Sequence, residues 1–177
     1  MRRVFLVMAA CCVLASPAFA GGGVDLYAAY GEVVDGDAEL GLGLRLSIGG
    51  THWMFDVGVT GFLEAEDVNI GPANEDSVTY RAWDLGLRYQ FYDGHKVRPY
   101  VGAGVTLAQV NAMDTRVDSG VGVYGLGGIR FGKPQGINFM AELIYRWTEV
   151  QARYDLTKEK DVSVGGLALQ AGISFAF

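Results

Sequence analysis

Few side chains in this 177-residue sequence have the types and spacing that acid–base or nucleophilic chemistry needs. Its two histidines are His52 and His95, and its two cysteines are Cys11 and Cys12. A histidine base works beside the nucleophile that it activates, but no serine stands two places from either histidine on one strand face. Both histidines fall in or beside short turns, so we predict solvated turn residues, no catalytic residue and no cofactor.

Acidic residues are the second candidate for chemistry. Segment 64–78 has five acids and no base, and the segment around Asp35 is also acidic. Carboxylate oxygens at close spacing suit Ca²⁺ or Mg²⁺, but no calcium-loop motif is present. We therefore predict a solvated acidic surface and assign no metal site, although divalent-cation binding there stays open.

Charge and composition limit the classes of partner and fold. The sequence has 20 acidic and 14 basic residues, a net charge of -6, with 50% hydrophobic and 19% charged residues. Nucleic-acid binding relies on clustered Lys and Arg, and disorder needs low hydrophobicity with high charge. The chain is expected to fold and not to bind nucleic acid.

The elements that position these side chains begin after residue 20. Arg2 and Arg3 precede the apolar stretch 4–15, and Ala18 and Ala20 stand where a signal peptidase reads small residues. The apolar stretch is shorter than the roughly 20 residues of a membrane helix. We predict a secretory signal peptide at 1–20 and one domain at 21–177, which has no cysteine and hence no disulfide. A lipoprotein signal ending before Cys11 is the weaker alternative.

Alternation of apolar residues with small or polar ones dominates the domain. Residues 40–48 are apolar at every even position, and residues 167–177 are apolar at odd positions, as in strands with one oily face. Eight tracts of this kind occupy 24–31, 38–48, 52–63, 79–92, 98–109, 120–131, 137–149 and 162–177. Short connections (49–51, 93–97, 132–136) alternate with long ones (32–37, 64–78, 110–119, 150–161). This pattern predicts an all-β, eight-stranded antiparallel up-and-down transmembrane β-barrel with periplasmic short turns.

The aromatic residues indicate which face meets lipid. In the apolar rows they gather at the tract ends, as Trp53 and Phe139 do near the short turns and Trp83 and Trp147 do toward the long loops. Two aromatic girdles around an aliphatic band are typical of a membrane interface. We therefore expect the apolar rows to face outward, in the cell outer membrane.

The opposite rows then face the interior, and their charges balance. An unpaired buried charge costs several kcal/mol, so a narrow interior favours the equal numbers of acids and arginines found there. The expected network contains Asp25, Arg45, Asp56, Asp84, Arg88, Arg130, Glu142 and Arg146.

Turn positions predict a register for this network. Turn 49–51 places Arg45 opposite Asp56, and a first loop centred near Asp35 places Asp25 opposite Arg45. We expect one ion cluster around Asp25, Arg45, Asp56 and Arg88, and a second set that contains Glu142 and Arg146.

These features together resemble the small outer-membrane β-barrel proteins of Gram-negative bacteria, the OmpA/OmpX-like and opacity-protein group. The resemblance rests on the signal peptide, the eight tracts, the strand start at 100–105 and the terminal segment 173–177, and it covers the whole mature chain. It implies that the barrel-assembly machinery reads a terminal signal made of Leu169, Ile173, Phe175 and Phe177. It also implies a monomer surrounded by outer-membrane lipid and lipopolysaccharide. The basic residues toward the loop end are themselves expected to contact lipopolysaccharide phosphates: Arg81, Arg153, Lys158 and Lys160.

The expected function is that of a non-enzymatic barrel with an envelope-structural or surface-interaction role through its loops. A lipid A- or lipopolysaccharide-modifying barrel enzyme is one alternative, but both histidines lie at the predicted periplasmic end, away from outer-leaflet lipid. A narrow channel for small solutes is the other, but eight strands leave an interior only wide enough for side chains.

Overall fold

The computed structural model describes residues 21–34, 37–62, 65–68, 76–91, 95–112, 116–117, 119–155 and 158–177. The predicted signal peptide at 1–20 and parts of the predicted long loops lie outside these residues.

One antiparallel sheet closes on itself into a barrel. Its wall consists of β1 (Gly21–Val34), β2 (Asp37–Gly49), β3 (Trp53–Phe62), β5 (Asp76–Gln90), β6 (Val97–Ala112), β8 (Gly120–Gly132), β9 (Gly136–Asp155) and an eighth strand in two parts, β10 (Lys158–Val164) and β11 (Leu167–Ala176). Each strand pairs with the next, and β1 pairs with both β2 and β11. The predicted eight-stranded fold class is therefore confirmed.

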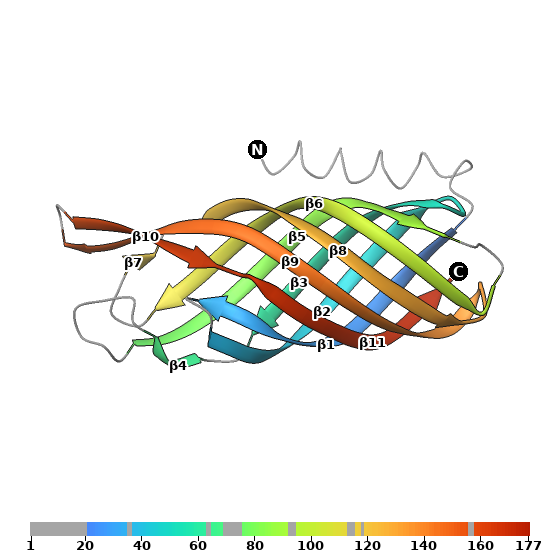
Figure 1. Ribbon diagram of the computed structural model, residues 1–177, viewed down its shortest axis with the longest axis horizontal. Coiled ribbons are helices and arrows are strands. Elements are labelled where there is room, and N and C mark those ends of the chain that lie inside the picture. Colours follow the sequence, from blue (N-terminus) through green and yellow to red (C-terminus); the bar gives the residue numbers. More distant parts are fainter. Residues whose placement is uncertain are drawn as a thin grey trace, which may run out of the picture.

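The two ends of the barrel differ. We call the end with residues 50–52, 91, 95–96 and 133–135 the short-turn end, and the opposite one the loop end. Figure 1 shows the tilted strands, with β10 and the short strands β4 (Ala65–Val68) and β7 (Arg116–Val117) at the loop end and the C-terminus at the other. No described residues form a helix that is long and apolar enough to cross a membrane.

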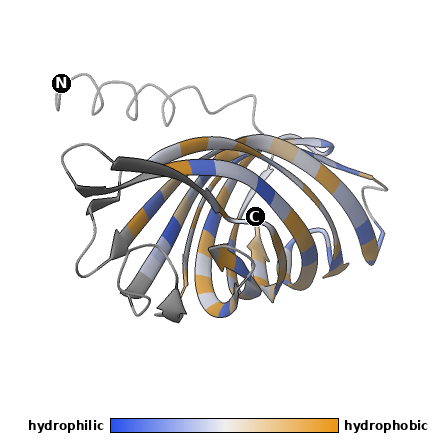
Figure 2. Ribbon diagram, turned by 60° about the vertical axis from the view of Figure 1, so that its left-hand side comes forward, coloured by the Kyte–Doolittle hydropathy of each residue, from blue (hydrophilic) through white to orange (hydrophobic). Residues whose placement is uncertain are grey.

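Side chains alternate strictly between the two faces of the wall. Along β3 exposed and buried residues follow one another from Trp53 to Phe62, and the hydropathy alternates in the same way along the strands in Figure 2. Leu46 is 48% exposed whereas the neighbouring Arg45 is 2% exposed. The polar row therefore faces inward and the apolar row faces outward, as the period-two pattern predicts.

Glycine makes room for large interior side chains at two positions. A Cβ at Gly43 would collide with the Tyr27 ring, and a Cβ at Gly86 would collide with the Tyr124 hydroxyl. Tyr124 belongs to a small buried cluster with Tyr100, Leu126, Ile144 and Ala168. Small residues thus leave room for large side chains from the adjacent strand, as for Tyr27, or from the strand after it, as for Tyr124, which fills the interior.

The eighth strand is interrupted at Gly165 and Gly166. Both glycines have positive φ angles, 93° and 130°, which L side chains rarely adopt. The Gly165 amide donates to the Val33 carbonyl oxygen at 2.9 Å, so the wall stays hydrogen-bonded across the interruption.

The strand boundaries differ from prediction mainly at the loop end. The predicted long loop 150–161 consists largely of paired strand, since β9 continues to Asp155 and β10 begins at Lys158. The alternation of apolar and polar residues does not mark these strands, because a hairpin that extends beyond the lipid needs no apolar row.

Candidate functional site

The barrel interior holds the largest set of charged side chains in the described structure. The structure buries every acid and arginine of the predicted network, each 5% exposed or less. Buried charges persist only when they are paired, and five ion pairs of 2.6–3.5 Å connect these eight residues.

Arg45 and Glu142 form the best aligned of these pairs. The Arg45 Nη1 and Nη2 atoms donate to the two Glu142 carboxylate oxygens at 2.7 and 2.6 Å, in the bidentate geometry that arginine favours. Arg45 Nη2 also donates to Gln170 Oε1 at 3.2 Å, and the guanidinium carbon lies 5.4 Å from the centre of the Tyr27 ring. Because Arg45 is on β2 and Glu142 on β9, this pair ties opposite walls together.

Asp25 connects two arginines nearer the short-turn end. It accepts hydrogen bonds from Arg130 Nη2 at 3.0 and 2.9 Å, and its Oδ2 lies 3.5 Å from Arg88 Nη1. Arg88 Nη2 also donates to Asp56 Oδ1 at 3.1 Å and to Ser47 Oγ at 2.7 Å. This cluster joins β1, β3, β5 and β8 across the lumen.

Asp84 and Arg146 form a third bridge toward the loop end. Arg146 Nη2 and Nε donate to the two Asp84 oxygens at 2.6 and 3.2 Å. Thr60 accepts a longer bond from Arg146 at 3.4 Å and shares a 2.9 Å bond with the Tyr27 hydroxyl. Ion pairs therefore cross the interior at successive levels along the barrel.

The predicted partners differ from these pairs in two places. Arg45 pairs in register with Asp25 as expected, but opposite Gly58 on β3, while Asp56 lies opposite Ser47. The predicted Arg45–Asp56 pairing is wrong by two residues because the turn occupies 50–52 rather than 49–51, which shifts the register of β3.

The expected grouping of Glu142 with Arg146 is also wrong. Four residues along one strand place their Cα atoms about 13 Å apart, too far for a direct bond. Each side chain instead reaches across the lumen, Glu142 to Arg45 and Arg146 to Asp84.

Sequence reasoning missed a fifth interior arginine, Arg98, which is 2% exposed. Its Nη2 donates to the Lys133 carbonyl oxygen at 2.9 Å and to Asn138 Oδ1 at 2.7 Å. The sequence contained the information needed to place it inside. Arg98 lies at an even-numbered position of its strand, as Gly102 and Gly104 do, and these positions form the inward row. Tyr100 lies in the same row and is also buried.

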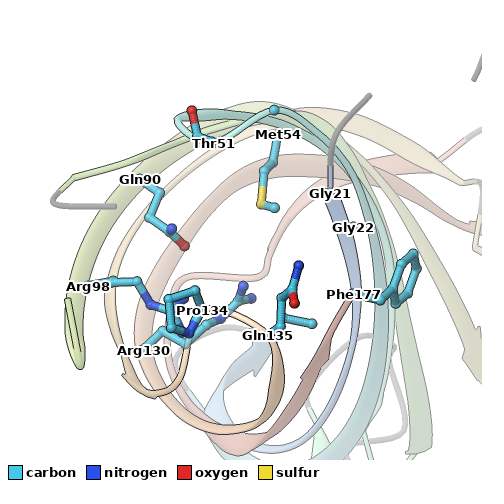
Figure 3. Close-up of a pocket in the computed structure, with 12 residues that line it drawn as sticks. Gly21, Gly22, Thr51, Met54, Gln90, Arg98, Arg130, Pro134, Gln135 and Phe177 are labelled. Atoms are coloured by element: carbon cyan, nitrogen blue, oxygen red, sulfur yellow. The ribbon is translucent and has the colours of Figure 1, made fainter. Parts of the chain in front are cut away.

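A cavity opens at the short-turn end of the interior. It has a volume of about 160 Å³ and is bordered by the short turns and the strand ends. Figure 3 shows Arg98, Arg130 and Gln90 on its wall, with Pro134 and Gln135 contributed by the turn between β8 and β9. No described group of three or more His, Cys, Asp or Glu side chains has the arrangement of a metal site.

Comparison with known proteins identifies the family. A sequence model of the outer membrane protein beta-barrel domain matches residues 4–177. The chain belongs to this family. Because the family is one of outer membrane proteins, the barrel lies in the outer membrane, and its exposed apolar row faces lipid. No curated protein sequence matches the chain at a significant level.

Solved structures show the same architecture at low sequence identity. The outer membrane protein OprG from Pseudomonas aeruginosa has 14% identity and a TM-score of 0.66, covering 89% of this chain and 95% of that one. Neisserial surface protein A (NspA) has 17% identity and a TM-score of 0.65, covering 90% and 97%. AlkL, an outer membrane protein determined in lipid bilayers, has 14% identity and a TM-score of 0.53, covering 89% and 90%. These likenesses concern the fold.

The outward row of this outer membrane barrel carries the predicted aromatic residues. Trp53 and Phe139 are 61% and 64% exposed near the short-turn end, and Trp83 and Trp147 are 44% and 56% exposed toward the loop end. The residues of the predicted assembly signal also lie in this exposed row, on β11 and immediately after it: Leu169, Ile173, Phe175 and Phe177.

The remaining predicted residues lie near the ends of the barrel. Arg81 is exposed on β5 in register with Gly61 and Gln109, while Arg153 lies on β9 and Lys158 and Lys160 on β10, where only the backbone is described. His52 is at the short-turn end, where its Nδ1 lies 3.1 Å from the Gln90 carbonyl oxygen and its ring stacks on Tyr89 with centroids 5.7 Å apart. His95 lies at the same end, just before β6.

Proposed function

We propose that this outer membrane protein is a non-enzymatic scaffold, with an envelope-structural or surface-interaction role through its loop end. One observation carries the proposal: four ion pairs join strands that lie on opposite sides of the lumen. They connect β2 with β9, β1 with β5, β1 with β8, and β5 with β9. Side chains that bridge the lumen occupy the path that a solute would need.

The position of the histidines supports a non-enzymatic role. Both histidines of the sequence, His52 and His95, lie at the short-turn end, which faces the periplasm in barrels of this architecture. A histidine base that modified outer-leaflet lipid would have to lie near the loop end. The His52 ring also packs on Tyr89 and contacts a backbone oxygen, which accounts for its position structurally.

The loop end offers the surface for such a role, and we propose lipopolysaccharide as its lipid partner. Arg81 is exposed on the outward face there, next in the row to Trp83, whose Nε1 donates to Gln109 Oε1 at 3.4 Å. Arginine binds phosphate through charge-assisted hydrogen bonds. Arg153, Lys158 and Lys160 extend the basic positions onto the β9–β10 hairpin. We further propose that the protein is a monomer and that the barrel-assembly machinery recognises the end of β11.

A deletion strain complemented with matched variants tests this proposal. One variant replaces residues 150–161 with a short turn, and its control exchanges an interior pair, Arg45→Glu with Glu142→Arg, which keeps the lumen bridged. We expect the wild type and the control to restore resistance to large hydrophobic antibiotics, and the shortened variant not to do so. Equal restoration by all three would overturn a role for this hairpin.

Two further measurements separate the alternatives. The purified protein in a planar bilayer is expected to give no single-channel steps, and regular steps would contradict the bridged-lumen argument. Lipid A from expressing cells is expected to keep its acyl chains, and a mass change that depends on His52 or His95 would establish an enzyme instead.

A further inference from the structure

The cavity at the short-turn end has a chemistry that the proposed function does not use. The described residues of its wall include two arginines, Arg98 and Arg130, and no Asp or Glu side chain, and the last residue, Phe177, also borders it. Both arginines are 2% exposed, so they are set into the wall rather than spread over the surface. Buried guanidinium groups at the wall of this hollow favour an anion there, because attraction between charges strengthens where water is excluded.

Arg130 retains a donor beyond its protein contacts. Its Nη2 is held by both Asp25 oxygens, while its buried Nε has no hydrogen-bond partner among the described residues. Asp25 is shared with Arg88, which also pairs with Asp56, so Arg130 has only a shared carboxylate as its ion-pair partner. A buried donor without a protein partner carries a free-energy cost, which an oxyanion at the cavity would relieve if the Arg130 side chain turned toward it.

Arg98 is held in place at the cavity wall. Its bonds to the Lys133 carbonyl and Asn138 Oδ1 fix the guanidinium against the turn between β8 and β9. Gln90, Thr51 and Gln135 add amide and hydroxyl groups to the lining, and all three are labelled around the opening in Figure 3. Guanidinium, amide and hydroxyl groups are the donors that recognise carboxylate and phosphate oxygens.

We propose that this cavity is a binding site for a small oxyanion group, a carboxylate or phosphate, presented from the periplasmic side. Its volume of about 160 Å³ is below the roughly 300 Å³ at which whole-ligand pockets begin. The site therefore takes a free small anion or the anionic end of a longer molecule whose remainder stays outside. The anion site lies at the opposite end of the barrel from the loops, so its test is independent of the scaffold role.

The test uses NMR spectroscopy to follow the arginine side-chain Nε resonances of the full-length mature protein in detergent micelles. Sodium acetate, phosphate and chloride are titrated separately at constant ionic strength. We expect the Arg98 and Arg130 signals to shift saturably with acetate or phosphate, with half-saturation at about 1 mM, which is attainable for a ligand of four or five heavy atoms. Identical, non-saturating shifts with all three salts would overturn the proposal.

Variants at the rim test the same site without removing a buried ion pair. Thr51→Glu and Gln135→Glu each place a carboxylate at the opening, and Thr79→Glu adds the same charge at the loop end as a control. A like charge at about 4 Å in water is expected to weaken binding about fivefold. The two rim variants should show this loss and the control should not, whereas equal affinity in all three would place the anion elsewhere.

A final comparison distinguishes the source of the oxyanion. N-acetyl-alanyl-alanine and its C-terminal amide differ only in the terminal carboxylate. Tighter binding of the acid than of acetate would assign the site to the end of a peptide, and affinity equal to that of acetate would assign it to free small anions. Binding of the amide as tightly as the acid would refute oxyanion recognition.

Discussion

Removal of one partner from the Arg45–Glu142 bridge is the perturbation whose effect the structure determines best. Glu142→Leu leaves the Arg45 guanidinium buried, with 3% of its side chain exposed. Of the contacts described above it then keeps the 3.2 Å bond to Gln170 and the Tyr27 ring, and no carboxylate. Two charge-assisted hydrogen bonds are lost, each worth about 1.5–3 kcal/mol. We therefore expect the free energy of unfolding to fall by about 3–5 kcal/mol, the range for breaking a buried pair.

A double-mutant cycle separates the pair from the cost of a stranded charge. The cycle uses Arg45→Met, Glu142→Leu and the double variant, each unfolded in urea from lipid vesicles and followed by tryptophan fluorescence. The double variant should be much less destabilised than the sum of the singles, since apolar residues replace a buried pair at little cost. Lys133→Met removes an exposed charge as a control and should change stability by less than about 0.5 kcal/mol.

The refuting result is equally specific. If each single variant loses less than about 1 kcal/mol, as exposed pairs do, the interior is solvated well enough to screen its charges. The bridged-lumen argument for a scaffold would then fail, and conduction would become the leading hypothesis.

Three further predictions concern assembly, packing and the membrane surface. Phe177→Ser should lower the yield of folded barrel in the outer membrane, seen as loss of the form that resists detergent when unheated, because the assembly machinery would read an altered end of β11. Gly86→Ala should destabilise the barrel by about 1–3 kcal/mol through overpacking against Tyr124, whereas Gly127→Ala, which meets nothing within 4 Å, should be neutral in the same urea assay. Arg81→Ala should abolish any stabilisation of the barrel by added lipopolysaccharide, and an unchanged increase in its melting temperature would exclude Arg81 from the phosphate contact.

Much of this barrel could be predicted from residue order. The period-two alternation decides which side chains share a face, and aromatic residues at strand ends indicate which face meets lipid. Asp25, Arg45 and Glu142 could be placed inside for this reason, and Arg98 could have been placed there by the same parity. Local spacing contains this information because successive strand residues point to opposite faces.

The partners of the interior charges depend on the tertiary structure. Glu142 bonds to Arg45, which is 97 residues away in sequence, and Asp25 bonds to Arg130, 105 residues away. These contacts depend on the stagger of the strands around the closed sheet, and one shifted turn moved Asp56 from Arg45 to Ser47. The cavity at the short-turn end likewise is lined by residues from separate turns. Sequence alone therefore determined the eight strands of the wall and their faces. Only closure of the barrel decided which charges meet, because register and shear are set between strands around the closed sheet and not along the chain.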